Sequence, residues 1–191
     1  MSAQAVFYFD LASPLAYLAS EQVMQRLGAP VDWQPVLSRR LADSPLQVPS
    51  REHIAERAQQ LGLQQLRWPS PFPFDSSPAM HAATYARSIG RSIPFAQAAF
   101  RQAFAGGHNL EQTDFVLIAA AACEMHPKAV LKGAALRSTA AELARATAAA
   151  AVMGIPDVPA LLVDEQLFLG EHALEDACAH LGNRATPSRP Q

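Results

Sequence analysis

Cysteine is scarce in this sequence, whose 191 residues include only Cys123 and Cys178. The two are far apart and lack the spacing of metal ligands. We interpret them as two thiols in the core of a cytosolic protein. The histidines at positions 53, 81, 108, 126 and 180 likewise show no ligand spacing with an acidic or sulfur-bearing partner. The sequence therefore predicts no metal site.

Basic runs and long apolar runs are also missing. The formal net charge is −2, and with no cluster of Lys or Arg we expect no nucleic-acid partner. The apolar run at 115–123 is too short to cross a membrane. The first residues lack the basic and apolar regions of a secretory signal. These absences predict a cytoplasmic protein with no membrane partner.

Half of the residues are hydrophobic, which is enough for one sizeable domain or for one domain with an insertion. Strands are predicted at 6–9, 31–36, 160–163 and 166–169; helices are predicted at 14–27, 51–63, 77–89, 92 to the glycines at 106 and 107, 111–125, 134–153 and 173–181. This order predicts an α/β protein with a thioredoxin-like fold and a large all-helical insertion. Residues 1–50 and 154–183 would form the thioredoxin-like domain, 51–153 the insertion and 184–191 a disordered tail.

The chain is organised around the first strand and the helix that follows it. Pro14 suits the first helical position because its fixed φ matches a helix start and its missing N–H costs nothing there. Ser13 is then the N-cap, and its hydroxyl lies at the positive end of a helix dipole, a place suited to an anion. Since Ser-Pro is also a common helix start, a purely structural cap is the alternative interpretation.

The tetrapeptide SPLA stands where a thioredoxin-type oxidoreductase carries Cys-Pro-x-Cys. Ser13 and Ala16 occupy the two cysteine positions. Disulfide chemistry is therefore excluded at this site.

Three motifs, FYFDLASPLAYL, FPFDSSPAMHAATYA and GIPDVPALLVDEQLFLG, resemble the 2-hydroxychromene-2-carboxylate isomerase family over residues 5–181. That family is related to the kappa-class glutathione transferases and more distantly to DsbA. The resemblance implies a glutathione-dependent isomerase that acts on an unsaturated aromatic keto acid by reversible thiol addition. It further leads us to expect a small-molecule substrate and a homodimer.

The resemblance also implies which residues form the site. Ser13 would hydrogen-bond the glutathione sulfur and favour the thiolate at the helix start that Pro14 opens. The Val158-Pro159 peptide would be cis, with Val158 pairing with the cysteinyl backbone. An ordinary loop is the alternative for this dipeptide. We further expect the Ser13 hydroxyl oxygen to lie within about 4 Å of a cavity that faces Val158.

Other expected contacts depart from the family pattern. His172 stands where the family has an acidic residue for the γ-glutamyl amine, with Glu171 beside it, and Asp75 replaces an asparagine that closes on the site. Weak glutathione binding is the predicted result. A kappa-type glutathione transferase and a non-catalytic thioredoxin-fold binding protein, whose Val158-Pro159 edge holds a peptide, are the alternative functions.

Overall fold

The structure is a computed structural model that describes residues 5–42 and 49–185. Its sheet has the strand order β2-β1-β3-β4, in which β1 is parallel to β2 and antiparallel to β3, and β3 and β4 form an antiparallel hairpin. The strands are β1 (Ala5–Phe9), β2 (Val31–Pro35), β3 (Ala160–Val163) and β4 (Gln166–Leu169). Pro35 lies on an edge strand, where its missing N–H interrupts no ladder.

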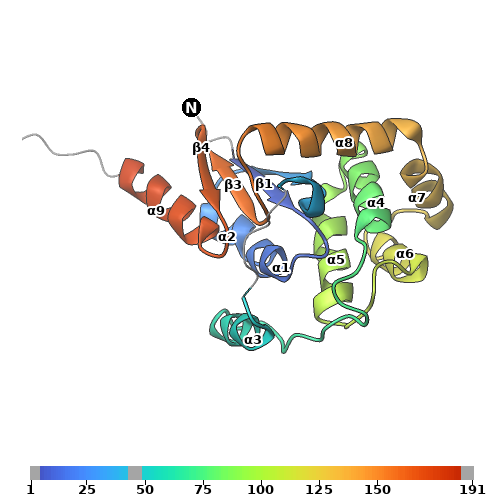
Figure 1. The fold of residues 1–191 in the computed structure, drawn as a ribbon, viewed down its shortest axis with the longest axis horizontal. Helices are drawn as coiled ribbons and strands as arrows, with labels where there is room; N and C mark the ends of the chain where they lie inside the picture. The colour runs from blue at the N-terminus through green and yellow to red at the C-terminus, as the bar shows by residue number, and fades with distance from the viewer. Residues whose placement is uncertain (1–4, 43–48, 186–191) are drawn as a thin grey trace, which may run out of the picture.

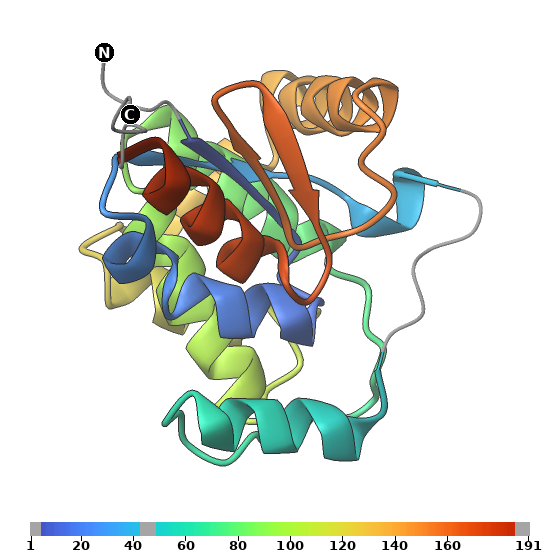
Figure 2. The ribbon, with the colours of Figure 1, turned by 90° about the vertical axis from the view of Figure 1, so that its left-hand side faces the viewer.

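Helices cover both faces of this sheet (Figure 1, Figure 2). They are α1 (Pro14–Ser20), α2 (Val23–Leu27), the short 3-10 helix η1 (Ser38–Arg40), α3 (Arg51–Gln60), α4 (Ser77–Ser88), α5 (Ser92–Phe104), α6 (Thr113–Ala121), α7 (Pro127–Ala134), α8 (Arg137–Val152) and α9 (Ala173–Ala185). In both views α1 and α8 lie on opposite sides of the sheet, and α3 lies beyond α1. The predicted thioredoxin-like fold with a helical insertion is confirmed.

Two predicted helices differ from the structure, one by a break and one at its start. The helix predicted at 14–27 is divided into α1 and α2, because Gln22 leaves the helical conformation and the Ser20 hydroxyl donates to the Tyr17 carbonyl at 2.7 Å. The alanine-rich helix predicted at 134–153 is confirmed as α8, but it begins at Arg137, because Leu136 has an extended backbone and Ala134 ends α7. Helix propensity favoured a helix from 134 onward, but propensity is a weak guide to where a chain must turn.

Aromatic packing beneath the sheet fixes the position of α1. Phe7 and Phe9 on β1 contact Trp33 on β2, with the Phe7 and Trp33 ring centroids 5.0 Å apart in edge-to-face geometry. Tyr17 on α1 stacks on Phe104 of α5 with ring centroids 5.5 Å apart. Since all five rings are buried, the end of β1 and the start of α1 are held by the same core.

No helix in the described ranges combines the length and apolarity needed to cross a membrane. Helix α9 continues to Ala185, beyond the predicted end at 181, and residues 186–191 of the predicted tail lie outside the described residues.

Candidate functional site

The end of β1 places the Ser13 hydroxyl at the start of α1. The Ser13 N–H donates to the Asp10 carbonyl oxygen at 2.9 Å, which closes a tight turn after the strand. Ser13 is the N-cap of α1, and its Oγ accepts a hydrogen bond from the Ala16 N–H at 3.2 Å. Pro14 is the first helical residue. The predicted strand, cap and proline are confirmed at this site.

The second predicted half of the site is Val158-Pro159, whose peptide bond is cis as expected. The Ser13 Oγ donates to the Val158 carbonyl oxygen at 3.1 Å. The two motifs therefore meet, although they come from opposite ends of the sequence. The direct hydrogen bond fills the space between these two groups, and the cavity expected beside them stays a prediction. A ligand has to displace or share this contact.

Asp157 satisfies the other polar group of Val158. Its Oδ1 accepts from the Val158 N–H at 2.7 Å, a charge-assisted bond. The Asp157 carboxyl is half-buried, and burial raises its pKa, with a smaller upward contribution from the nearby Asp10 charge. Both backbone polar groups of Val158 thus have partners within the chain.

Asp10, whose backbone carbonyl accepts from the Ser13 N–H, carries a fully buried carboxyl group. Its Oδ1 accepts from the Ala12 N–H at 2.9 Å, and its Oδ2 accepts from the Ser38 N–H at 2.9 Å and from the Ser38 hydroxyl at 3.1 Å. Burial raises the pKa of Asp10, and these hydrogen bonds offset part of that rise. Asp10 therefore ties the loop after β1 to the chain that follows β2.

Met80 on α4 supports the same loop through its sulfur. The N–H of Leu11 donates to the Met80 Sδ at 3.2 Å, and both residues are fully buried. A thioether is a weak acceptor, but here it partners a backbone donor that water does not reach.

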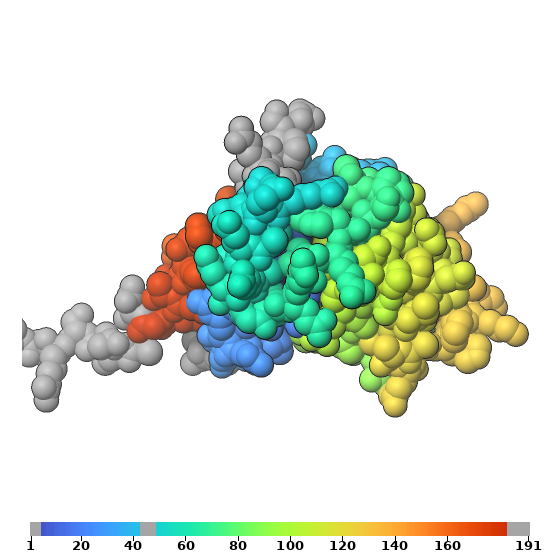
Figure 3. Space-filling model, turned by 90° about the horizontal axis from the view of Figure 1, so that it is seen from below, coloured from blue at the N-terminus to red at the C-terminus, as the bar shows by residue number. Residues whose placement is uncertain are grey.

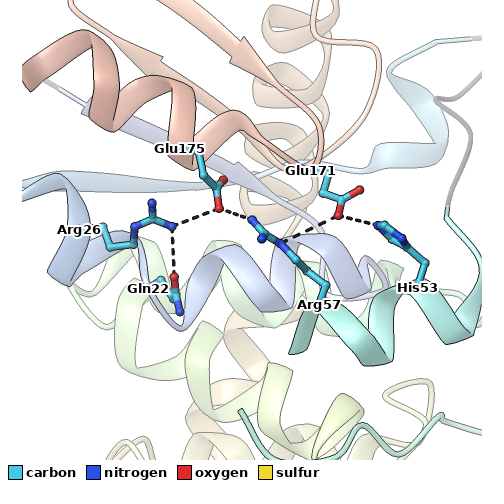
Figure 4. A network of polar contacts seen from close by, with 6 residues as sticks. All are labelled: Gln22, Arg26, His53, Arg57, Glu171 and Glu175. Atoms are coloured by element: carbon cyan, nitrogen blue, oxygen red, sulfur yellow. Dashed lines mark hydrogen bonds and ion pairs between the residues drawn. The ribbon is translucent and has the colours of Figure 1, made fainter. Parts of the chain in front are cut away.

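Glu171 already takes part in a network of polar contacts (Figure 4). Its Oε1 lies 2.7 Å from His53 Nε2 and 4.0 Å from Arg57 Nε, both on α3. Arg57 also pairs with Glu175, which bonds Arg26 at 3.2 Å. The network joins α3 to α2 and α9. Beside it, His172 is exposed to solvent.

Helix α3 lies beside α1 (Figure 2). In the space-filling view from below, the chain from α3 to α4 spreads across the centre of this face beside the blue α1 and α2 (Figure 3). A small cleft between α1, α3 and α9 is lined by Leu15, Leu18, Arg57, Leu61, Glu171 and Leu174, among others. At the start of α3, the Arg51 guanidinium lies 4.7 Å from the Trp68 ring centroid.

Asp75 takes part in a separate surface cluster. Its Oδ1 lies 2.8 Å from Arg39 Nη1 and accepts from the Ser77 N–H at 2.9 Å. These contacts hold the pKa of Asp75 below its usual value, with the Ser77 bond the largest cause. The structure therefore brings Ser13, Pro14, Val158 and Pro159 together, and it engages Glu171 and Asp75 elsewhere.

Sequence reasoning missed the roles of Asp10, Met80 and His53. The sequence gives one indication for Asp10, because an acidic residue directly after a buried strand needs hydrogen-bond donors. The partners of Met80 and His53 lie far away in sequence, and no local sequence pattern predicts such contacts. Across the described ranges, no group of three or more His, Cys, Asp or Glu side chains is placed to hold a metal ion.

Residues 4–182 match the family described as DSBA-like thioredoxin domain. The chain belongs to this family. No curated protein sequence matches it.

Solved structures share the fold of this family member at low sequence identity. A 2-hydroxychromene-2-carboxylate isomerase is 16% identical, with 95% of this chain and 96% of that chain covered and a TM-score of 0.83. A probable DsbA oxidoreductase from Streptomyces coelicolor is 18% identical, with 99% and 92% covered and a TM-score of 0.76. The cytosolic disulfide reductase DsbM from Pseudomonas aeruginosa, solved with GSH, is 16% identical, with 95% and 98% covered and a TM-score of 0.67.

These similar structures bear the names of an isomerase, an oxidoreductase and a disulfide reductase. At such identities they show the fold alone. In this DSBA-like chain, positions 13 and 16 are serine and alanine, and Cys123 and Cys178 lie on other parts of the fold.

Proposed function

We propose that this protein is a glutathione-dependent isomerase of the 2-hydroxychromene-2-carboxylate isomerase type, acting on an unsaturated aromatic keto acid. The observation that carries the proposal is the Ser13 hydroxyl, half-buried at the start of α1 and in contact with Val158. A hydroxyl at this position donates a hydrogen bond to a thiolate but forms no disulfide. The isomerase with a TM-score of 0.83 and the GSH-containing reductase support the choice of fold and thiol.

The residues around Ser13 suit a thiolate. The N-terminus of α1 places a partial positive charge there, which lowers the pKa of a bound thiol. The Ser13 hydroxyl, which now donates to the Val158 carbonyl, would turn to donate to the sulfur. When bound, glutathione supplies the thiolate that adds reversibly to the double bond and allows rotation about it. No metal or redox change is required.

Val158 and Pro159 would hold the cysteinyl backbone of glutathione. The Val158 carbonyl oxygen can accept from a ligand N–H, and its N–H can donate to a ligand carbonyl. Glu171 and His172, the rim of the site, contribute less to glutathione binding. Glu171 is paired with His53 and Arg57, and the exposed His172 supplies no negative charge for the γ-glutamyl ammonium. Glutathione binding is accordingly proposed to be weak.

One observation favours a non-catalytic binding protein as the second candidate. The Ser13 hydroxyl already accepts from Ala16 and donates to Val158, as a structural cap would. In that case Ser13 fixes α1 to β3, and no chemistry occurs at the hydroxyl.

Turnover measurements separate the two candidates. An unsaturated aromatic keto acid is followed by its ultraviolet absorbance, with and without glutathione, for the natural protein and Ser13→Ala. We expect glutathione-dependent isomerisation that Ser13→Ala largely abolishes while the protein remains folded by circular dichroism. Equal turnover by the two proteins would make Ser13 structural.

Glutathione titration of the natural protein and His172→Asp tests the rim. The aspartate restores a charge partner for the γ-glutamyl ammonium, so affinity should rise on the order of ten- to a hundredfold. Tight binding by the natural protein would show that the recognition site lies elsewhere.

A further inference from the structure

Asp157 accepts the hydrogen bond of the Val158 N–H, a donor that a thiol carried by a peptide, such as glutathione, would need. Its Oδ1 accepts from the Val158 N–H at 2.7 Å, while the Val158 carbonyl oxygen lies 3.1 Å from the Ser13 Oγ. We propose that Asp157 determines the thiol specificity of the site by competing with peptide thiols for the Val158 N–H. The proposal rests on the proposed function, since it assumes that a thiol binds at Ser13.

A peptide thiol bound at Ser13 necessarily approaches Val158. In a cysteinyl residue the sulfur is separated from the backbone by one methylene group, so the ligand N–H and C=O lie within a few bonds of the sulfur. The Ser13 Oγ is itself in hydrogen-bond contact with Val158. The polar backbone groups of the ligand and of Val158 therefore face one another, in the pairing that extended peptides make with a strand.

The two polar groups of Val158 differ in how easily they are shared. A carbonyl oxygen has two lone pairs, so it can accept from a ligand N–H while Ser13 keeps or releases its bond. A backbone N–H has a single hydrogen, which Asp157 already holds. A carboxylate is also a stronger acceptor than an amide carbonyl. The N–H of Val158 is thus the contested group.

A simple thiol meets no such competition. 2-Mercaptoethanol places its sulfur at Ser13 without an amide carbonyl, so it makes no demand on the Val158 N–H. Asp157 should therefore lower the affinity of glutathione and leave that of 2-mercaptoethanol unchanged. The site discriminates between the two thiols through a residue that touches neither sulfur.

The experiment follows amide chemical shifts while each thiol is titrated into the natural protein, Asp157→Ala and Asp157→Asn. Asp157→Ala removes the competing acceptor, so glutathione affinity should rise about tenfold, the scale of one lost hydrogen bond. Asp157→Asn keeps an acceptor oxygen without the charge, and an intermediate rise is expected. Asp176→Ala is the charge-matched control, because it removes an exposed carboxylate on α9; neither affinity should change.

The same spectra show whether each variant is folded. Equal glutathione affinity for the natural protein and Asp157→Ala overturns the proposal, as does an equal rise for both thiols or no glutathione binding by either protein. A failure of the proposed reaction can be distinguished from a failure of the proposed specificity role. If Asp157→Ala binds glutathione more tightly while Ser13→Ala retains full turnover, the specificity role stands and the isomerase mechanism through Ser13 does not.

Discussion

The hydroxyl of Ser13 donates a hydrogen bond to the carbonyl oxygen of Val158, 3.1 Å away and 145 positions later in the chain. The same hydroxyl accepts from Ala16 and caps α1. One side chain therefore joins the first helix to the segment that enters β3. It links local helix capping with the long-range assembly of the site.

The Ser13 hydroxyl should contribute more stability than an ordinary cap. Ser50 is the matched control, since its Oγ accepts from the His53 N–H at 3.2 Å and caps α3 away from Val158. Ser50→Ala should cost about 1 kcal/mol, the usual loss of a cap. Ser13→Ala should cost about 1 kcal/mol more, because it also removes the bond to the Val158 carbonyl. Urea unfolding measures both, and equal losses would contradict this additional role.

Met80→Leu should be destabilising although the side-chain volumes are similar. Leucine offers no acceptor, so the buried Leu11 N–H loses its partner, at a cost of about 1–3 kcal/mol. Met24→Leu on α2 is the control, because Met24 is 40% exposed and should tolerate the change. Chemical unfolding of both variants decides the matter. Equal stability would show that the sulfur is dispensable as an acceptor.

The Asp157 carboxyl should make stability fall as the pH rises. Its pKa is raised in the folded protein, chiefly by burial. Between its unfolded and folded pKa the folded state binds more protons, so this contribution is fully present below the unfolded pKa and is lost as pH rises through the folded pKa. Asp157→Asn keeps an acceptor oxygen but does not titrate.

Urea unfolding between pH 4 and neutral, values chosen to span a raised carboxyl pKa, should show a steeper decline for the natural protein than for Asp157→Asn. If the stability of the natural protein instead rose with pH relative to that of Asp157→Asn, the environment of Asp157 would favour its charged form. Comparison with the variant removes the contributions of groups such as Asp75 and Glu175, whose pKa values are lowered.

Glu171→Gln should loosen α3 with little effect on global stability. The substitution weakens the contacts of Glu171 with His53 and Arg57, and partly exposed ion pairs contribute less than about 1 kcal/mol. Amide hydrogen exchange in α3 should nevertheless accelerate, because this network links the helix to α9. Glu142→Gln, which removes an exposed pair with Arg145 inside α8, should leave α3 unchanged. Unaltered exchange after Glu171→Gln would mean that apolar contacts alone position the helix.

Much of the fold and the centre of the site could be predicted from the sequence. Hydrophobic patterns and turn residues gave the four strands, and the Ser13-Pro14 start was readable because capping is a local property. The junction of Ser13 with Val158 required a family resemblance, since a contact between distant segments leaves no local pattern.

Other features depend on tertiary structure and escaped prediction. The break before α8 is hidden in a run of good helix formers. The engagement of Glu171 by His53 depends on how α3 is placed against α9, which single-sequence patterns do not specify. The proposed competition between Asp157 and a ligand for the Val158 N–H could not be predicted either, because it depends on the direction in which one Asp157 oxygen points.

The sheet order has a consequence for the protein's biosynthesis. Tyr8 on β1 pairs with Ala160 on β3, and a ribosome working at about 5–20 residues per second needs on the order of ten seconds to make the chain between them. Throughout that interval one edge of β1 is open, and an open edge pairs readily with other extended chains. The nascent chain therefore depends on early burial by its own helices or on chaperones until the C-terminal hairpin emerges and completes the site.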